Sequence, residues 1–392
     1  MGILERTNTI KLQNKILQTH FSKKNNVERS INFPVAELKR YDALTGLRAF
    51  AVTLVFIYHN RKYWKANLHP EIIRFLNEFH IGVSIFFVLS GFLIAYTYGA
   101  RTIVNLKSYA HYIIIRLARI LPLYWLILTA YYLDPDFGKQ KFSALTYTLT
   151  HGLSNKFNLN AIAQAWSLSV EMCFYFLAPL LFIFTKKRII YYFLAILILF
   201  TVFVAVGYLW YYVNGNSNQF LYPIDFILNS TIAGRSTEFI AGVLLANYIR
   251  EKENNLFLKV RYKTLIGFAG MFFTIILIGW FQNENFKDGN DHPIGKIIFM
   301  TILPVFISFS IAGLIFEKTL FQRFLSSKFL ILLGNASYSF YLIHISYVNI
   351  RIRGVWLGPD RNFIILWLVS ILLYLFFEKP IYLWIRKKVK YK

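Results

Sequence analysis

Ten long apolar segments follow one another along the chain, separated by shorter polar connections. Most approach the length of about 20 residues that an α-helix needs to cross a bilayer. They occupy residues 45–60, 80–98, 117–133, 166–185, 189–213, 231–249, 264–281, 294–316, 330–350 and 362–378. The sequence therefore predicts an all-α, polytopic integral membrane protein with about ten transmembrane helices.

The composition agrees with a membrane protein and excludes a disordered chain. Hydrophobic residues make up 56% of the sequence and charged residues only 16%, against about a quarter charged in ordinary soluble domains. The net charge of +24 arises from 43 Lys and Arg residues against 19 Asp and Glu residues. In a soluble chain this excess would favour nucleic acid, but in a membrane protein it reports orientation. No nucleic-acid partner is expected.

The cationic residues are divided unevenly between the polar connections. If residues 1–44 lie inside the cell, the inner connections together carry 29 Lys and Arg residues and the outer connections carry 12. Cytoplasmic connections of membrane proteins are enriched in these residues. The bias predicts both termini in the cytoplasm and a multi-pass protein of the inner (cytoplasmic) cell membrane.

The polar ends frame one membrane domain. We expect residues 1–44 to form a basic cytoplasmic arm, residues 45–378 the transmembrane domain, and residues 379–392 a basic cytoplasmic tail. The arm does not resemble a secretory signal. The single cysteine, Cys173, excludes an internal disulfide and a cysteine-based metal site. No metal is expected.

Ionisable side chains inside membrane helices are functional candidates because they cost several kcal/mol unless they are paired or hydrated. Arg48 and His59 stand eleven residues apart in the first predicted helix. Eleven helical steps return to the same face and rise about 16 Å, so one groove could hold both side chains. Alternatively, Arg48 reaches the inner interface and His59 the outer one, where each contacts water.

Two arginines mark the predicted cytoplasmic start of the third helix. Arg116 and Arg119 are three residues apart, which places them on one helical face. Arginine binds phosphate through two parallel hydrogen bonds and stays charged when partly dehydrated, so an anionic donor from the cytosol could bind here. The alternative is ordinary anchoring of the helix end by positive charge.

Further charges lie in later helices. Glu171 is predicted near the outer end of the fourth helix, and Arg235 and Glu238 near the outer end of the sixth. Because Arg235 and Glu238 are three residues apart, a purely structural ion pair competes with a role in a site.

Polar and aromatic side chains add weaker candidates. Ser337, Tyr338 and His344 interrupt the ninth apolar segment. Hydroxyl groups in membrane helices often only bridge neighbouring helices, and we favour that interpretation for Ser337 and Tyr338. Trp166 could stack on a sugar ring, although most aromatic residues here are expected to face lipid or the interface.

Taken together, these segments resemble the membrane-bound acyltransferase 3 family from about residue 42 to residue 350. Any one motif is weak, but six in the same order are specific. In chain order they are Leu44 to Arg48 with His59 (an Arg-x10-His pattern), Phe86 to Phe92 (FFVLSGF), Arg116 to Pro122 (a basic motif), Trp166 to Glu171 with Phe174 and Tyr175 (WSLSVE-x-x-FY), Arg235 with Glu238, Phe239 and Gly242, and Ser337 to His344.

Four positions depart from the family pattern. Thr45 and Ser84 stand where many members have Asp, Met172 stands where a second Glu is frequent, and Leu117 replaces the second arginine of an Arg-Arg-x-x-Arg form. These departures concern secondary contacts only.

The resemblance implies an enzyme that transfers an acyl group, usually acetyl, from cytosolic acyl-coenzyme A to a hydroxyl of a cell-envelope carbohydrate. The expected partners are the lipid bilayer, acyl-CoA as co-substrate and a carbohydrate or glycolipid acceptor, with no tightly bound cofactor. A thioester donor requires a base for the acceptor hydroxyl, donors for the oxyanion and cations for the phosphates.

We assign hypothetical roles on this basis. Arg116, Arg119 and Arg48 would hold the coenzyme A phosphates, Arg48 also serving in catalysis, and His59 would be the general base. Glu171 would orient the His59 imidazole or the acceptor. Supporting or acceptor-binding roles are assigned to Trp166, Ser167, Arg235, Glu238, Ser337, Tyr338 and His344.

The sequence leaves the catalytic route open. A His or Ser nucleophile, Ser337 among the candidates, would allow donor and acceptor to bind at different times, whereas direct transfer requires both in one cavity. Two functions from other classes compete with the acyltransferase. A transporter of a lipid-linked sugar or small anion would be expected to show an internal repeat, which we do not find, and a non-catalytic sensor would have no need of Arg48 and His59.

Overall fold

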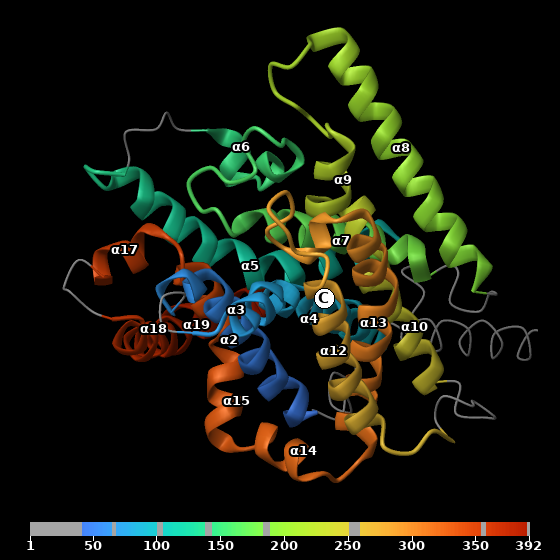
Figure 1. Ribbon diagram of the computed structural model, residues 1–392. Coiled ribbons are helices and arrows are strands. Elements are labelled where there is room, and N and C mark those ends of the chain that lie inside the picture. Colours follow the sequence, from blue (N-terminus) through green and yellow to red (C-terminus); the bar gives the residue numbers. More distant parts are fainter. Residues whose placement is uncertain are drawn as a thin grey trace, which may run out of the picture. The chain divides into compact units, whose positions relative to one another are not determined.

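The computed structural model describes residues 41–64, 68–99, 105–137, 143–182, 189–250, 259–353 and 358–389. These residues form helices and connections, and no β-strand is found among them. The longer helices are α2 (Asp42–Trp64), α4 (Ile81–Tyr98), α5 (Leu106–Leu133), α7 (Ala165–Phe182), α8 (Ile190–Asn214), α10 (Ile232–Arg250), α12 (Lys263–Gly279), α13 (Pro293–Phe316) and α18 (Pro359–Leu373), arranged as in Figure 1.

Shorter helices complete this part of the chain. They are α3 (Pro70–Asn77), η2 (Glu78–His80), α6 (Ala144–Tyr147), η3 (Thr150–Leu153), α9 (Ile224–Ser230), η4 (Gly289–Asp291), α14 (Leu320–Leu325), α15 (Lys328–Asn335), α16 (Ser337–Ile343), α17 (Tyr347–Arg353), the π-helix η5 (Tyr374–Glu378) and α19 (Lys379–Lys388).

In the part of the chain that the structure describes, all ten predicted apolar segments lie largely on helices; residues 183–185 of the fourth segment lie outside it. Among the described residues, six helical segments are long and apolar enough to cross a membrane: Pro70–Tyr98, Leu106–Leu133, Ala165–Phe182, Ile190–Asn214, Pro293–Phe316 and Arg361–Lys388. The predicted all-α fold with several membrane-crossing helices is confirmed. The number of ten crossings and the cytoplasmic side of both termini remain predictions.

Helix α5 begins earlier than its apolar run suggests. It starts at Leu106 rather than near residue 117 because Asn105 and Ser108 form a capping box, in which each side chain bonds to the backbone of the other residue. The sequence predicts Arg116 and Arg119 at the first turn of this helix. In the structure they lie in its interior instead. Both side chains are partly exposed.

The ninth apolar segment is not one helix but three. Polar side chains capture backbone carbonyl groups at both breaks: Ser337 Oγ donates to Gly334 O at 2.8 Å, and the Asn349 amide donates to His344 O. Such local bonds compete with the helical hydrogen-bond ladder. The break before Ser337 and the one after Ile343 divide the segment into α15, α16 and α17, and α15 and α17 run in different directions (Figure 1).

The last apolar segment also extends beyond its predicted end. Residues 374–378 form the π-helix η5, and α19 continues from Lys379 to Lys388. Most of the predicted C-terminal tail that the structure describes is thus helical. The predicted N-terminal arm lies outside the described residues except for 41–44.

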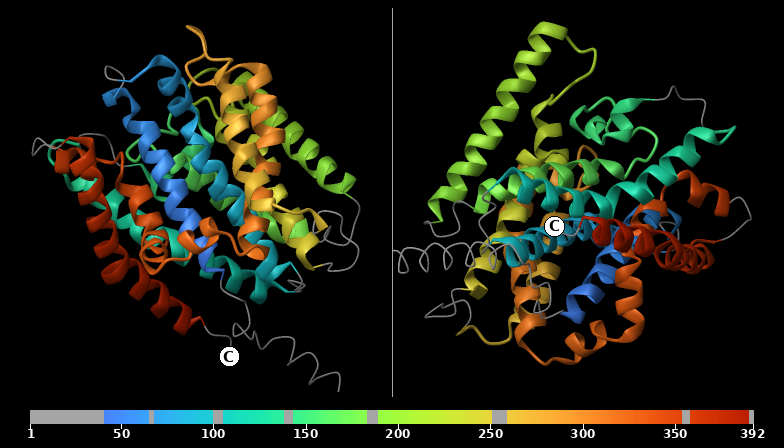
Figure 2. Two further views of the ribbon diagram at one scale, coloured as in Figure 1. Left: turned by 60° about the horizontal axis from the view of Figure 1, so that its bottom comes forward. Right: turned by 180° about the vertical axis from the view of Figure 1, so that it is seen from behind.

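Helix α4 lies at the centre of the bundle against α2, α7, α10 and α13. Its contact with α10 depends on two glycines. A Cβ on Gly91 would overlap the backbone oxygen of Phe239, and a Cβ on Gly242 would overlap that of Val88. Small residues allow membrane helices to approach this closely. At the edge of the bundle, by contrast, α8 is mostly exposed (Figure 2).

Substituting Gly91 by Ala should destabilise the protein. The added methyl group meets backbone atoms, which cannot move aside as a flexible side chain can, and overpacking of this kind typically costs about 1–3 kcal/mol. Thermal unfolding in detergent measures the effect. Gly279→Ala is the matched control, since its nearest neighbouring atom, Arg74 Cγ, lies 3.5 Å from the new Cβ; equal midpoints for the two variants would contradict the close-contact interpretation.

A carboxylate holds the hairpin formed by α12 and α13, which lie side by side in Figure 2. Glu317, directly after α13, accepts hydrogen bonds from the backbone N–H groups of Lys263 and Thr264 at 2.6 and 2.9 Å, and from Thr264 Oγ1 at 2.6 Å. Lys263 and Thr264 are the first two residues of helix α12. The first N–H groups of a helix have no partner within the helix. Burial alone would raise the pKa of Glu317, but the hydrogen bonds hold it below its ordinary value.

Glu317→Ala should therefore destabilise the protein at neutral pH by about 1 kcal/mol, the usual cost of losing a helix cap. Because the pKa of Glu317 is lowered in the folded state, its contribution is present above the ordinary titration range of a Glu carboxyl and is lost as pH falls through the lowered value. Thermal midpoints of wild type and variant should consequently converge in acid. A difference that persists unchanged at low pH would show that the charge is not involved.

Candidate active site

A polar cavity of about 350 Å³ opens at the end of the bundle where α2 ends and where α4, α7, α10 and α13 begin. We term it the histidine cavity. Its polar and aromatic lining includes Tyr58, His59, His80, Gln164, Trp166, Arg235, Asp288, Asp291 and Tyr341. The structure thus brings together His59, Trp166 and Arg235, which were predicted from separate sequence motifs.

His59 is the most accessible imidazole in this cavity. Its side chain is exposed, and its ring lies 4.9 Å from the Tyr58 ring and 5.2 Å from the His344 ring, between centroids. Within the described part of the chain, no side chain forms a hydrogen bond with it. An accessible imidazole without a fixed partner can accept a proton from a bound molecule.

His344 lies beneath His59 and is fully buried. Its Nδ1 lies 2.6 Å from the backbone oxygen of Tyr341. Because a carbonyl oxygen can only accept, Nδ1 carries the proton and a neutral ring presents a lone pair at Nε2. That Nε2 atom has no partner among the described residues. His344 therefore supports the floor of the cavity and does not open into it.

Arg235 and Glu238 form a buried ion pair at the side of the cavity. Arg235 Nε and Nη2 donate to the two oxygens of Glu238 at 2.7 and 2.8 Å, and Nη2 also lies 3.2 Å from Ser84 Oγ. The guanidinium is sandwiched between Phe87 and Phe299, 5.3 and 5.0 Å from their centroids. This bidentate ion pair fixes the position of the Arg235 guanidinium. The guanidinium can therefore line the cavity without moving.

The cavity rim is formed by a connection that precedes α13. The buried carboxylate of Glu78 accepts hydrogen bonds from the backbone of Gly289 at 2.6 Å and from Gln282 at 2.5 Å. Tyr58 donates to Asp288 at 2.5 Å. Burial, together with the neighbouring Asp288, raises the pKa of Asp291. This rim could not be predicted from the sequence, because Glu78 directly precedes an apolar run and has the position of an ordinary interfacial charge.

A second polar cluster lies deeper in the bundle and combines α2, α5, α7 and η5. We term it the arginine cleft and define it by Arg48, Arg116, Arg119, Glu171 and Glu378. Arg48 interacts electrostatically with Arg119, Glu171 and Glu378. All five side chains are partly exposed.

The three arginines of the cleft have no carboxylate within ion-pair distance in the described part of the chain. Arg116 lies over the rings of Tyr98 and Tyr112, 5.0 and 5.9 Å from their centroids. The Nε atoms of Arg48 and Arg116 are buried and have no hydrogen-bond partner among the residues that the structure describes. Arginines left in this state have donors available for an anionic ligand.

Glu171 belongs to the arginine cleft and not to the histidine cavity. Its Oε1 atom accepts hydrogen bonds from Ser90 Oγ at 2.6 Å and from Tyr175 OH at 2.7 Å. It forms no hydrogen bond with His59. The hypothesis that Glu171 orients the His59 imidazole therefore has no geometric basis in this structure.

Tyr341 separates the two sites. Its hydroxyl lies 2.7 Å from Ser167 Oγ, and its ring lies 6.2 Å from that of Phe86. Ser167 precedes Glu171 by one helical turn, and Tyr341 lines the histidine cavity. The predicted supporting residue Ser167 thus lies in the wall between cavity and cleft.

The remaining predicted residues of α16, Ser337 and Tyr338, donate hydrogen bonds to backbone oxygens. Ser337 donates to Gly334 O at 2.8 Å, and Tyr338 donates to Ile120 O at 2.7 Å. Ser339, which we had not singled out, donates to Glu378 Oε2 at 2.8 Å. Ser337 and Tyr338 consequently join helices, and neither hydroxyl is directed to a carboxylate.

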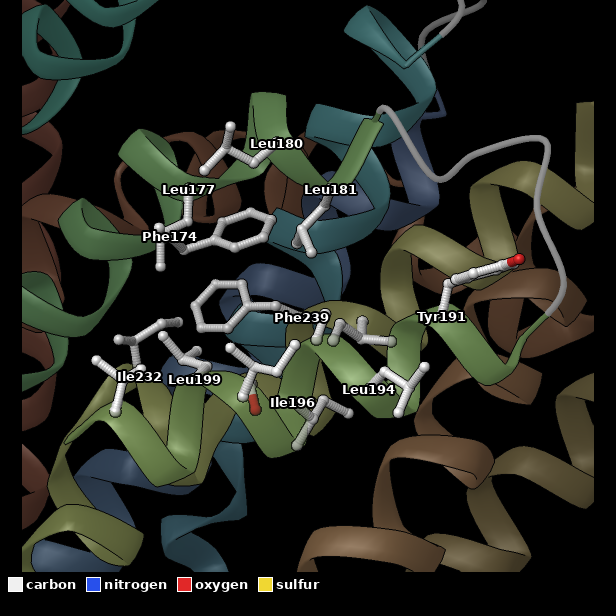
Figure 3. A pocket seen from close by; sticks show the side chains of 15 residues that line it. Phe174, Leu177, Leu180, Leu181, Tyr191, Leu194, Ile196, Leu199, Ile232 and Phe239 are labelled. Atoms are coloured by element: carbon white, nitrogen blue, oxygen red, sulfur yellow. The ribbon is translucent and has the colours of Figure 1, made fainter. Parts of the chain in front are cut away.

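A third hollow, of about 430 Å³, is apolar (Figure 3). It lies between α7, α8 and α10, and its floor includes Phe174 and Phe239, whose rings stack with centroids 4.1 Å apart. Phe239 also stacks on Phe87 at 4.7 Å. Tyr191 is its one titratable lining residue, so this hollow has no groups for acyl transfer.

The fold and its two polar sites define a helical membrane protein with a histidine cavity above an arginine cleft. A family model described as an acyltransferase domain matches residues 41–379, and the chain therefore belongs to the acyltransferase 3 family. This confirms the family resemblance seen in the sequence.

Named relatives agree with this membership. The chain is 26% identical over 330 residues to the O-acetyltransferase OatA of Staphylococcus aureus strain NCTC 8325 / PS 47, and equally to that of strain COL. The match covers 77% of this chain and 49% of each relative, so the chain spans about half the length of these relatives. No solved structure matches the chain.

Proposed function

We propose that this protein is a membrane-embedded O-acyltransferase that moves an acyl group, most simply acetyl, from acyl-CoA to a hydroxyl of a cell-envelope carbohydrate. The observation that carries the proposal is that helix α2 holds, at two levels, an exposed histidine, His59, and an arginine, Arg48, that has no ion-pair partner among the described residues. The relatives named O-acetyltransferase support the choice of acetyl and of oxygen as acceptor.

The arginine cleft is the donor site in this proposal. Coenzyme A carries several phosphate oxygens, and arginine guanidinium groups bind these through paired, charge-assisted hydrogen bonds. Of the two arginines on α5, Arg116 lies nearer the start of the helix, so in this proposal it contacts a phosphate, while Arg48 interacts electrostatically with Glu171. With the predicted orientation, the cleft receives its donor from the cytosol.

The histidine cavity is the acceptor site. His59 is placed to remove the proton from a bound hydroxyl, and Trp166 offers an aromatic face for a sugar ring. The Asp288 and Asp291 carboxylates at the rim add acceptors for other hydroxyls of the carbohydrate. With the predicted orientation, this cavity lies at the outer side of the inner membrane, where a lipid-linked or membrane-near glycan would approach.

Arg116→Ala should weaken donor binding. Loss of one charge-assisted hydrogen bond costs about 1.5–3 kcal/mol, so KM for acetyl-CoA should rise roughly 10- to 100-fold with a smaller change in kcat. Initial rates of the purified full-length protein against acetyl-CoA concentration measure this. Arg116→Lys should recover part of the loss, because an ammonium keeps the charge but not the planar fork.

The control for donor binding is Arg323→Ala, which removes a cation on α14 outside the cleft. Its KM should equal that of wild type. A KM unchanged in Arg116→Ala would contradict the donor site.

His59→Ala should abolish acyl transfer to the acceptor. Proton NMR before and after mild alkali measures O-acetyl esters on surface glycans of cells that lack the protein or carry wild type or variant. Esters should disappear on deletion and return with wild type but not with His59→Ala at equal membrane abundance, because the acceptor hydroxyl then lacks its base.

His69→Ala is the matched control for this experiment, because His69 lies in an exposed connection and only caps α3. It should restore the esters fully. Glycan acylation that never changes would reject a surface glycan as acceptor, and failure of the purified protein to consume acetyl-CoA would favour transport.

A further inference from the structure

The serine hydroxyls near the arginine cleft differ in their partners. Ser337 donates only to a backbone oxygen. Ser339 donates to Glu378 but is fully buried. Ser90 donates to the Glu171 carboxylate at 2.6 Å and is partly exposed. Among these three, Ser90 alone combines an adjacent carboxylate with access for a ligand.

We propose that Ser90 is a covalent acyl carrier, which accepts the acyl group from the donor before it reaches the acceptor. This inference rests on the proposed function and divides it into two half-reactions. It replaces Ser337 as the candidate nucleophile, because a hydroxyl needs an adjacent base to become reactive and Ser337 has none within the described residues.

The first half-reaction uses groups already in contact. Ser90 Oγ attacks the thioester carbon and passes its proton to Glu171, a bond from Oγ to carbon forms, and the carbon–sulfur bond breaks. The proton then passes from Glu171 to the departing thiolate, which leaves as the free thiol of coenzyme A. Arg48, whose Nε has no partner and which interacts with Glu171, supplies positive charge for the oxyanion.

The second half-reaction regenerates the serine. The acceptor hydroxyl gives its proton to His59 and its oxygen attacks the ester carbon. The bond between that carbon and Ser90 Oγ breaks. Oγ takes up a proton that Glu171 has accepted from solvent, and His59 releases the acceptor's proton to solvent. The acceptor leaves as an ester, and no further reactant is needed.

The position of Ser90 suits a carrier between the two sites. It follows Phe86 by one helical turn, and the Phe86 ring contacts Tyr341, which lines the histidine cavity. The acyl group on Ser90 would therefore lie on the cleft side of Tyr341, and the acceptor hydroxyl would reach it past that side chain. The neighbouring Gly91 fixes this part of α4 against α10, so the nucleophile is held on a rigid element.

The test uses the purified full-length protein in nanodiscs with radiolabelled acetyl-CoA and no acceptor. Wild type should retain label on the peptide that contains residue 90, and Ser90→Ala should lose both this label and transfer to acceptor. Ser90→Cys, which preserves size, should take up label that neutral hydroxylamine removes, as expected of a thioester. Ser370→Ala is the control, since Ser370 is buried on α18 and bonds only to Leu366 O of its own helix.

The outcomes separate the two proposals. Label on residue 90 that disappears in Ser90→Ala and persists in Ser370→Ala supports the carrier. Transfer to acceptor by wild type without bound label, or transfer within about threefold of wild type by Ser90→Ala, overturns the carrier and leaves the acyltransferase intact. Absence of any acetyl-CoA consumption by wild type overturns both.

Discussion

Charge inside a membrane must be paired or hydrated, and this bundle meets the requirement in two different ways. Arg235 is neutralised by Glu238 through two short hydrogen bonds and enclosed by aromatic rings. Arg48, Arg116 and Arg119 have no such pairing within the described residues, and each of these side chains is partly exposed. A paired arginine has a structural role, whereas an arginine held without a partner keeps hydrogen-bond donors available for a ligand. The functional proposal follows from that difference.

Helix α4 connects these two arrangements. Ser84 contacts Arg235, Phe86 contacts Tyr341 in the dividing wall, and Ser90 contacts Glu171 in the cleft. The three side chains occupy less than two turns, so a small shift of α4 along its axis would displace all of them. The glycine contacts with α10 prevent that shift, because backbone lies against backbone. A packing feature thereby fixes the chemistry, which is why the FFVLSGF segment combines small, aromatic and hydroxyl residues.

The sequence predicted the helices well because transmembrane length and hydropathy are local properties. Spacing within one helix also indicated the ion pair of Arg235 with Glu238. It placed Arg48 and His59 on one face of α2, but the structure divides them between the arginine cleft and the histidine cavity. The predicted helix boundaries were wrong where side-chain hydrogen bonds override the hydropathy pattern. The capping box at Asn105 lengthens α5, and polar bonds divide the ninth segment. Glu378 was missed because a π-helix has no distinct periodicity in the sequence. The hydrogen bonds from Ser90 and Tyr175 to Glu171 could not be predicted, because contacts between helices leave no spacing signal.

The wall between cavity and cleft bears on how acyl transfer can occur. Along α2, Arg48 and His59 are separated by a rise of about 16 Å, and Tyr341 with Ser167 lies between the cavity and Glu171. Direct transfer would require the donor arm to pass this wall and would expose the thioester to water from the other side. With a carrier, only the acceptor hydroxyl has to pass Tyr341 to reach the acyl group, and coenzyme A stays in the arginine cleft. The position of Tyr341 at the histidine cavity and the carboxylate-bonded Ser90 therefore favour the same stepwise route.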